Sequence, residues 1–144
     1  MNKIGTRLKA IRKNAGYKQW QISEKLGLAK HSYGSYENDN SIPSISKFIV
    51  LSEIFQTTVQ YIVTGEELSA DIWSEKVTPF PERLKELRIQ NEFTQKEVAN
   101  ELEIHFRSYE KYELGICEPK LESLIKLANL FDVTLDELLG RNRT

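Results

Sequence analysis

The chain contains one sequence pattern twice. Residues 4–65 align with residues 80–141 without a gap, at a constant offset of 76 positions and with 15 identities. This repeat is longer than the roughly 20–50 residues of a solenoid repeat, and close to the size at which a small domain folds alone. The sequence therefore predicts two tandem domains, at 1–65 and 80–144, joined by a connector at 66–79. The two aligned ranges are called the first copy and the second copy below.

Composition narrows the class of protein without identifying it. The chain has 144 residues, 40% of them hydrophobic and 28% charged, as globular proteins do. No apolar run approaches the roughly 20 residues of a membrane-spanning helix, and the N-terminus has no apolar signal segment. A single cysteine, Cys117, excludes an internal disulfide. We expect a cytoplasmic protein with no membrane association.

Charge is divided unequally along the chain. Residues 1–65 hold nine Lys or Arg against four Asp or Glu, whereas residues 80–144 hold ten against thirteen. The connector holds one against four, which leaves the whole chain at −1. A polyanion is therefore expected to bind the first copy more strongly than the second.

Apolar residues in both copies recur at helical spacing, and no stretch alternates as a strand would. Thr94 and Glu97 form a capping box that opens a second helix, and the turn after that helix is at Gly27 or Glu103. We expect each copy to contain five short helices. The third helices are predicted at 29–37 and 105–113, and the fourth at 45–55 and 121–131.

Two short helices joined by a tight turn form the helix-turn-helix motif. Its characteristic residues in the second copy are Arg83-Leu84-Lys85, Thr94-Gln95, Ser108, Tyr112-Glu113-Leu114-Gly115, Pro119 and Leu135-Asp136-Glu137-Leu138-Leu139, and in the first copy Arg7-Leu8-Lys9, Gln19, Gly27, Ser32, Tyr36-Glu37-Asn38 and Pro43. These residues resemble the lambda repressor/Cro-like family, also called the xenobiotic-response-element family. The resemblance implies an all-α fold of two tandem five-helix DNA-binding domains, encoded by a prokaryote or a phage.

Five positions depart from the family pattern. Lys18 replaces the capping Thr of the second helix, Ser23 replaces a core Ala, and Glu103 replaces the Gly of the turn. Ala29 and His105 replace the usual Ser or Thr at the start of the third helix, at an expected cost of about 1 kcal/mol each. We expect both copies to be weakened but folded.

The resemblance implies that the third helix enters the major groove of DNA. Lys30 and Arg107 are then suited to guanine, whereas Phe106 is suited either to thymine methyl groups or to a protein interface. The candidate DNA-binding residues are Gln19, Ala29, Lys30, His31, Ser32 and Ser35 in the first copy, and Gln95, His105, Phe106, Arg107, Ser108 and Lys111 in the second. For the glutamines and serines the alternative role is capping and bracing. The tyrosines Tyr33, Tyr36, Tyr109 and Tyr112 are expected to pack in or against the core.

Residue patterns of enzymes are missing. His31 and His105 occupy non-equivalent positions of the two copies, and neither has a Cys or carboxylate partner at metal-ligand spacing. No glycine-rich phosphate loop is present. We predict no catalytic activity, no cofactor and no metal.

Three functions fit the sequence to different degrees. The favoured one is a sequence-specific transcriptional regulator that binds double-stranded DNA, most often a repressor in this family. The alternative is a protein-interaction module, such as an antitoxin or phage-encoded inhibitor that also represses its own gene, with the acidic second copy binding the partner. An architectural DNA binder is disfavoured by the near-zero net charge. We also expect a homodimer held partly by Phe106, and an ordered connector in which Leu68, Ile72 and Trp73 form an apolar side.

Overall fold

The computed structural model describes residues 3–67 and 78–141. The chain divides into two compact units, Met1–Leu68 and Ser69–Thr144, and each is considered by itself. The elements assigned within the described ranges are α-helices, five in each unit, which confirms the all-α fold expected from the sequence. The helices are α1 (Ile4–Asn14), α2 (Gln19–Lys25), α3 (Gly34–Glu37), α4 (Ile45–Ile54) and α5 (Val59–Thr64), then α6 (Phe80–Gln90), α7 (Gln95–Leu102), α8 (Phe106–Leu114), α9 (Leu121–Leu130) and α10 (Leu135–Leu138).

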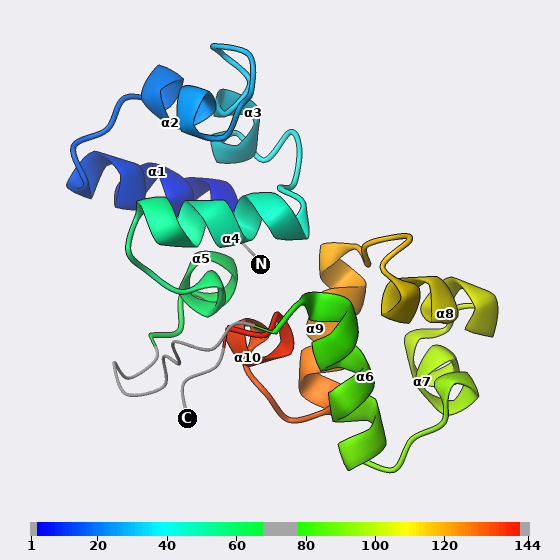
Figure 1. Ribbon diagram of the computed structural model, residues 1–144. Helices are drawn as coiled ribbons and strands as arrows, with labels where there is room; N and C mark the ends of the chain where they lie inside the picture. Colours follow the sequence, from blue (N-terminus) through cyan, green and yellow to red (C-terminus); the bar gives the residue numbers. More distant parts are fainter. Residues whose placement is uncertain (1–2, 68–77, 142–144) are drawn as a thin grey trace. The chain divides into compact units, whose positions relative to one another are not determined.

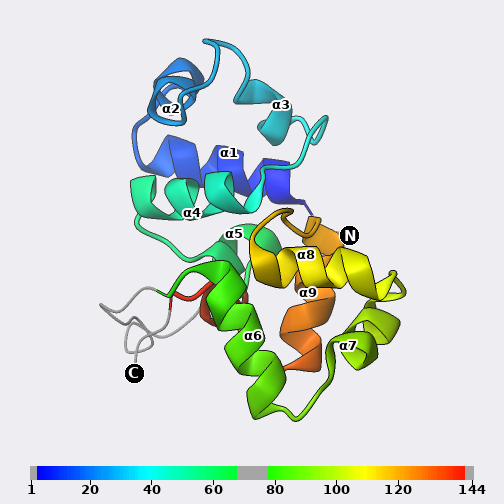
Figure 2. The ribbon, with the colours of Figure 1, turned by 45° about the vertical axis from the view of Figure 1, so that its right-hand side comes forward.

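The first unit is built around α1 and α4, which lie side by side, while α2 and α3 lie beyond α1 (Figures 1 and 2). Helix α5 packs against both α1 and α4. The core contains Leu8, Ile22, Phe48, Leu51 and Ile62, each with no more than 1% of its surface exposed. Burial of such side chains stabilises a domain by roughly 1.5–3 kcal/mol each.

The second unit repeats this arrangement. Helix α8 packs against α6 and α7, and α10 packs against α6 and α9 (Figure 1). Leu84, Val98, Leu124, Leu127 and Leu138 are almost fully buried. The apolar spacing that predicted the helices therefore also predicted the side that each helix buries.

Side-chain caps explain where several helices begin. The capping box predicted at Thr94 is present, and a second one occurs at Thr134. In each, the hydroxyl accepts the backbone N–H three residues on and a Glu carboxylate accepts the threonine N–H. His105 was expected to be a poor cap, and this was wrong. Its Nδ1 accepts the N–H of Arg107 at 3.1 Å, so the imidazole satisfies one of the free donors at the start of α8.

The third helix of the first copy differs from the prediction. A helix was expected at 29–37, but α3 covers only Gly34–Glu37, and the residues before it form turns. Ser32 N–H donates to Ala29 O and Tyr36 N–H to Tyr33 O, so the bonds close tighter turns than those of an α-helix. Two residues explain this: Ala29 offers no side-chain cap, and Gly34 is a poor helix former.

The connector prediction rested on Leu68, Ile72 and Trp73, which lie outside the described residues. No helix in the described part of the chain is both long and apolar enough to cross a membrane.

Candidate nucleic-acid interface

A buried ion pair joins α1 to α3 in the first copy. Arg12 Nε donates to one carboxylate oxygen of Glu37 at 2.6 Å, and its second nitrogen donates to the other oxygen at 3.1 Å. The third guanidinium nitrogen donates to Tyr17 O at 2.9 Å, and Gln19 Nε2 donates to Glu37 at 2.9 Å. The Glu37 carboxylate thus links three elements: α1, the first residue of α2, and α3. These bonds hold the helix-turn-helix motif together.

The second copy contains the same network at the positions shifted by 76. Arg88 donates to both oxygens of Glu113 at 2.6 and 3.1 Å and to Phe93 O at 3.0 Å. Gln95 Nε2 donates to Glu113 at 3.1 Å. Gln19 and Gln95, chosen as candidate DNA-binding residues, therefore also brace the motif.

The sequence interpretation gave no role to Arg12, Arg88, Glu37 or Glu113. All four are among the identities shared by the copies, and that identity was the signal from which a pairing could have been inferred.

The surroundings of Glu37 keep it ionised. Burial alone would raise the pKa of its carboxyl group, but the hydrogen bonds from Arg12 and Gln19 outweigh burial and hold the pKa below its ordinary value of 4.5. Tyr33, which is fully buried, has its pKa raised, first by burial and then by the nearby Glu37 carboxylate. Tyr33 and Tyr109 belong to the core, as predicted.

Ser23, one of the departures from the family pattern, has a specific partner. Its buried hydroxyl accepts the N–H of Tyr33 at 3.0 Å. In the second copy the equivalent Tyr109 N–H donates instead to His105 O at 3.3 Å, within the helix, and the equivalent of Ser23 is Ala99. Ser23 therefore supplies the hydrogen bond that Tyr33 lacks because the helix does not extend to Ala29.

Most candidate residues of the first copy are accessible. Ala29, Lys30, His31 and Ser32 are exposed on the turns before α3. Ser35 is half-buried, and its hydroxyl already forms hydrogen bonds within the protein. It donates to Ser32 O at 2.9 Å and lies 2.6 Å from the hydroxyl of Ser41.

In the second copy, the exposed candidates are His105, Arg107, Ser108 and Lys111, while Phe106 is half-buried. The homodimer expected from the sequence was to be held partly by an exposed Phe106 ring, and Phe106 is not fully exposed. The ring is stacked with His105, with centroids 5.2 Å apart, and carries Lys96 Nζ at 5.3 Å and the Arg107 guanidinium at 5.6 Å from its centroid.

Other large apolar residues of the second copy are exposed, among them Ile89 in α6 and two residues at the end of α8 and just after it. Leu114 is 63% exposed and Ile116 is 66% exposed, and the neighbouring Cys117 is also exposed. At the equivalent positions the first copy has Asn38, Asn40 and Ser41, which are polar. The two copies therefore present different chemistry at the end of the third helix.

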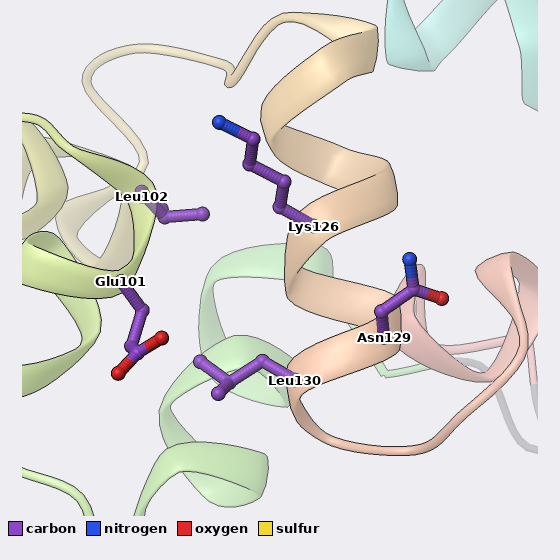
Figure 3. A pocket seen from close by; sticks show the side chains of 5 residues that line it. All are labelled: Glu101, Leu102, Lys126, Asn129 and Leu130. Carbon is purple, nitrogen blue, oxygen red and sulfur yellow. The ribbon is translucent and has the colours of Figure 1, made fainter.

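A shallow hollow of about 400 Å³ lies between α7 and α9 in the second unit (Figure 3). Leu102 and Leu130 line it, while the Lys126 ammonium and the Glu101 carboxylate point away from each other. Within residues 3–67 and 78–141, no group of three or more His, Cys, Asp and Glu side chains is arranged to hold a metal ion.

Comparison with known families agrees with this geometry. A family described as "Helix-turn-helix domain" matches residues 5–68, and one described as "Helix-turn-helix" matches residues 84–138. The chain belongs to the helix-turn-helix proteins. It carries one such domain in each copy, which confirms the lambda repressor/Cro-like resemblance drawn from the sequence.

Relatives of this helix-turn-helix chain are named as transcriptional regulators. AnsR of Bacillus subtilis is 45% identical over 62 residues, which cover 43% of this chain and 53% of AnsR. The phage CTXphi transcriptional repressor RstR of Vibrio cholerae is 42% identical over 60 residues, covering 42% of this chain and 54% of RstR. The transcriptional activator BcrR of Enterococcus faecalis is 38% identical over 61 residues, covering 42% of this chain and 30% of BcrR. The chain thus spans about half the length of AnsR and RstR, and less of BcrR.

Proposed function

We propose that the chain is a sequence-specific transcriptional regulator that binds double-stranded DNA in the cytoplasm of a bacterium, and that it acts as a repressor. The observation that carries this proposal is the repeated network around Glu37 and Glu113. In each copy it anchors the end of the third helix to the first two helices, and basic and polar residues are exposed at the start of that segment. Such a segment is suited to the major groove.

The sign of regulation rests on the relatives. RstR is named a repressor and BcrR an activator, so the domain serves both. Repression is favoured because a domain that covers an operator can exclude a polymerase without further contacts.

The test is selection of bound DNA from a random pool by the full chain, repeated with charge-reversed variants Lys30→Glu and Arg107→Glu. The proposal is supported if the wild type enriches one DNA sequence motif. Each variant should then enrich a motif that differs from it in one part. A pool that remains random after selection would overturn it.

A second candidate function is favoured by the exposed Leu114 and Ile116. Exposed apolar residues that lie close together in the chain are typical of protein interfaces. These two belong to the second copy, whose net negative charge does not attract DNA. We propose that this loop mediates homodimer formation or binds a protein partner. The double variant Leu114→Asn with Ile116→Asn introduces the residues of the first copy, so sedimentation should then report a mass near 16.7 kDa where the wild type is heavier. If the wild type sediments as a monomer, homodimer formation is excluded and only binding of a different protein remains.

A further inference from the structure

Phe106 is an apolar residue at the position where the motif normally presents a hydrogen-bonding side chain. It is the first residue of α8 and is half-buried, so part of the residue remains accessible. The ring is held by the His105 imidazole, by Lys96 and by Arg107. Its surroundings are therefore basic even though the second copy as a whole is acidic. A basic environment suits contact with DNA, which is a polyanion.

Phe106 and Arg107 are also fixed in position relative to each other. His105 Nδ1 accepts the Arg107 N–H, which defines the first turn of α8. One turn later Tyr109 is fully buried and anchors the same helix to the core. The two side chains are thus presented together from a rigid helix start, as base recognition requires.

The first copy carries an aromatic residue and a lysine at the same two positions, but exchanged. Trp20 in α2 is the equivalent of Lys96, and Lys30 is the equivalent of Phe106. Trp20 is 43% exposed. Each copy therefore has one aromatic residue and one lysine at these two positions, and only the second copy has the aromatic residue at the start of the third helix.

The chemistry of the major groove limits what an aromatic ring can recognise there. Base edges present hydrogen-bond donors and acceptors, and the main apolar feature is the methyl group at C5 of thymine. We propose that Phe106 contacts the C5 methyl group of a pyrimidine while Arg107 binds the guanine next to it. This inference rests on the proposed function, since it names the operator step that the second copy recognises. Thymine and 5-methylcytosine both carry a methyl group at this place.

The test uses the full chain and a duplex taken from the selected DNA, with binding followed by fluorescence anisotropy at one salt concentration. Each thymine in turn is replaced by uracil, which removes only the methyl group. One replacement should weaken binding by about fourfold, the ratio that corresponds to transfer of one methyl-sized group out of water. Because this arm uses the wild-type protein, it does not depend on how a variant folds.

Variants then assign the effect to Phe106. Phe106→Ala should bind the thymine and uracil duplexes equally, whereas Phe106→Leu should keep the preference for thymine. Lys30→Ala is the matched control in the first copy and should keep it as well. Replacement of the adjacent guanine by 7-deazaguanine should weaken the wild type but not Arg107→Ala. Cytosine and 5-methylcytosine at the same position then test the second source of the methyl group. Tighter binding of 5-methylcytosine than of cytosine would show that Phe106 contacts the methyl group of either base.

Two results would overturn the inference while the proposed function stands: sequence-specific binding in which no thymine-to-uracil change matters, or an effect that persists in Phe106→Ala. Failure to select any DNA sequence overturns the proposed function instead, so the two failures are distinguishable.

Discussion

In the second copy the third helix has nine residues, Phe106–Leu114, whereas in the first copy only the four residues Gly34–Glu37 are helical. Both segments are nevertheless held by the same Arg, Gln and Glu side chains at equivalent positions. The comparison shows that this network fixes the end of the segment, while its beginning is free to differ. The difference lies where DNA would be read.

The beginning of each segment has its own hydrogen-bond arrangement. The second copy continues the helix back to His105, whose side chain caps it. The first copy replaces that helical bond by the buried hydroxyl of Ser23. Ser23 and Ala29, which looked like independent losses in the sequence, are therefore two parts of one local rearrangement.

The largest expected effect is a loss of stability, and it tests whether the two ion-pair networks contribute equally to the folding of their copies. Arg12→Ala or Arg88→Ala leaves a carboxylate that is 1% or 3% exposed without its cation. Loss of one partner of a buried ion pair costs about 3–5 kcal/mol, which approaches the whole stability of a small domain. Each variant should therefore unfold its own copy and lose about half of the helical circular dichroism signal.

The controls for this prediction are Lys9→Ala and Lys85→Ala, which remove exposed lysines from the same two helices. They should leave the signal unchanged. A full loss in one arginine variant and none in the other would show that the two copies use the network differently.

The next effect tests the rearrangement in the first copy. Ser23→Ala leaves the buried Tyr33 N–H without its acceptor, and an unsatisfied buried donor costs about 1–3 kcal/mol. The reciprocal Ala99→Ser should not stabilise the second copy, because Tyr109 N–H already donates to His105 O. Urea denaturation of both variants measures the two changes. A stable Ser23→Ala protein would mean that the segment can recover the helical bond to Ala29.

Much of the fold followed from the sequence because it depends on nearby residues. The capping boxes at Thr94 and Thr134 act over three residues, and the apolar spacing defines which face of each helix is buried. The gapless repeat predicted two copies of one domain, and the residues that resemble the lambda repressor/Cro-like family predicted its type. Ser23 and Tyr33 are ten residues apart, so their hydrogen bond could not be inferred from local propensity.

The candidate site was predicted less completely for a similar reason. Arg12 and Glu37 are 25 residues apart, and only the fold brings them into contact. Phe106 was expected to be exposed because its own position suggests a surface, but Lys96 from another helix covers part of its ring. Contacts between helices decide such details, and the sequence of one helix does not contain them.

A third prediction concerns the unequal charge of the copies. Lys30→Ala should weaken DNA binding by about 1–3 kcal/mol and relax one base position, because the basic first copy supplies most of the affinity. Arg107→Ala should cost less affinity and relax a different position. Anisotropy titrations on the selected duplex give both values. If Arg107→Ala abolishes binding while Lys30→Ala has no effect, the roles of the two copies are reversed.

The smallest effect separates backbone strain from side-chain packing at the turn of the motif. Glu103 has φ of 58° and its equivalent Gly27 has φ of 70°, so both occupy the left-handed region that favours glycine. A Cβ added to Gly27 would meet no atom within 4 Å, so Gly27→Ala changes only the backbone preference and should destabilise the first copy by about 1 kcal/mol. Glu103→Gly should stabilise the second copy by a similar or smaller amount, because part of the gain is offset by the greater freedom of glycine in the unfolded chain.

Opposite shifts of the urea midpoints of the two variants would show that the turn has the same strained geometry in both copies. A destabilised Glu103→Gly protein would show instead that the Glu103 side chain contributes more than its backbone strain costs.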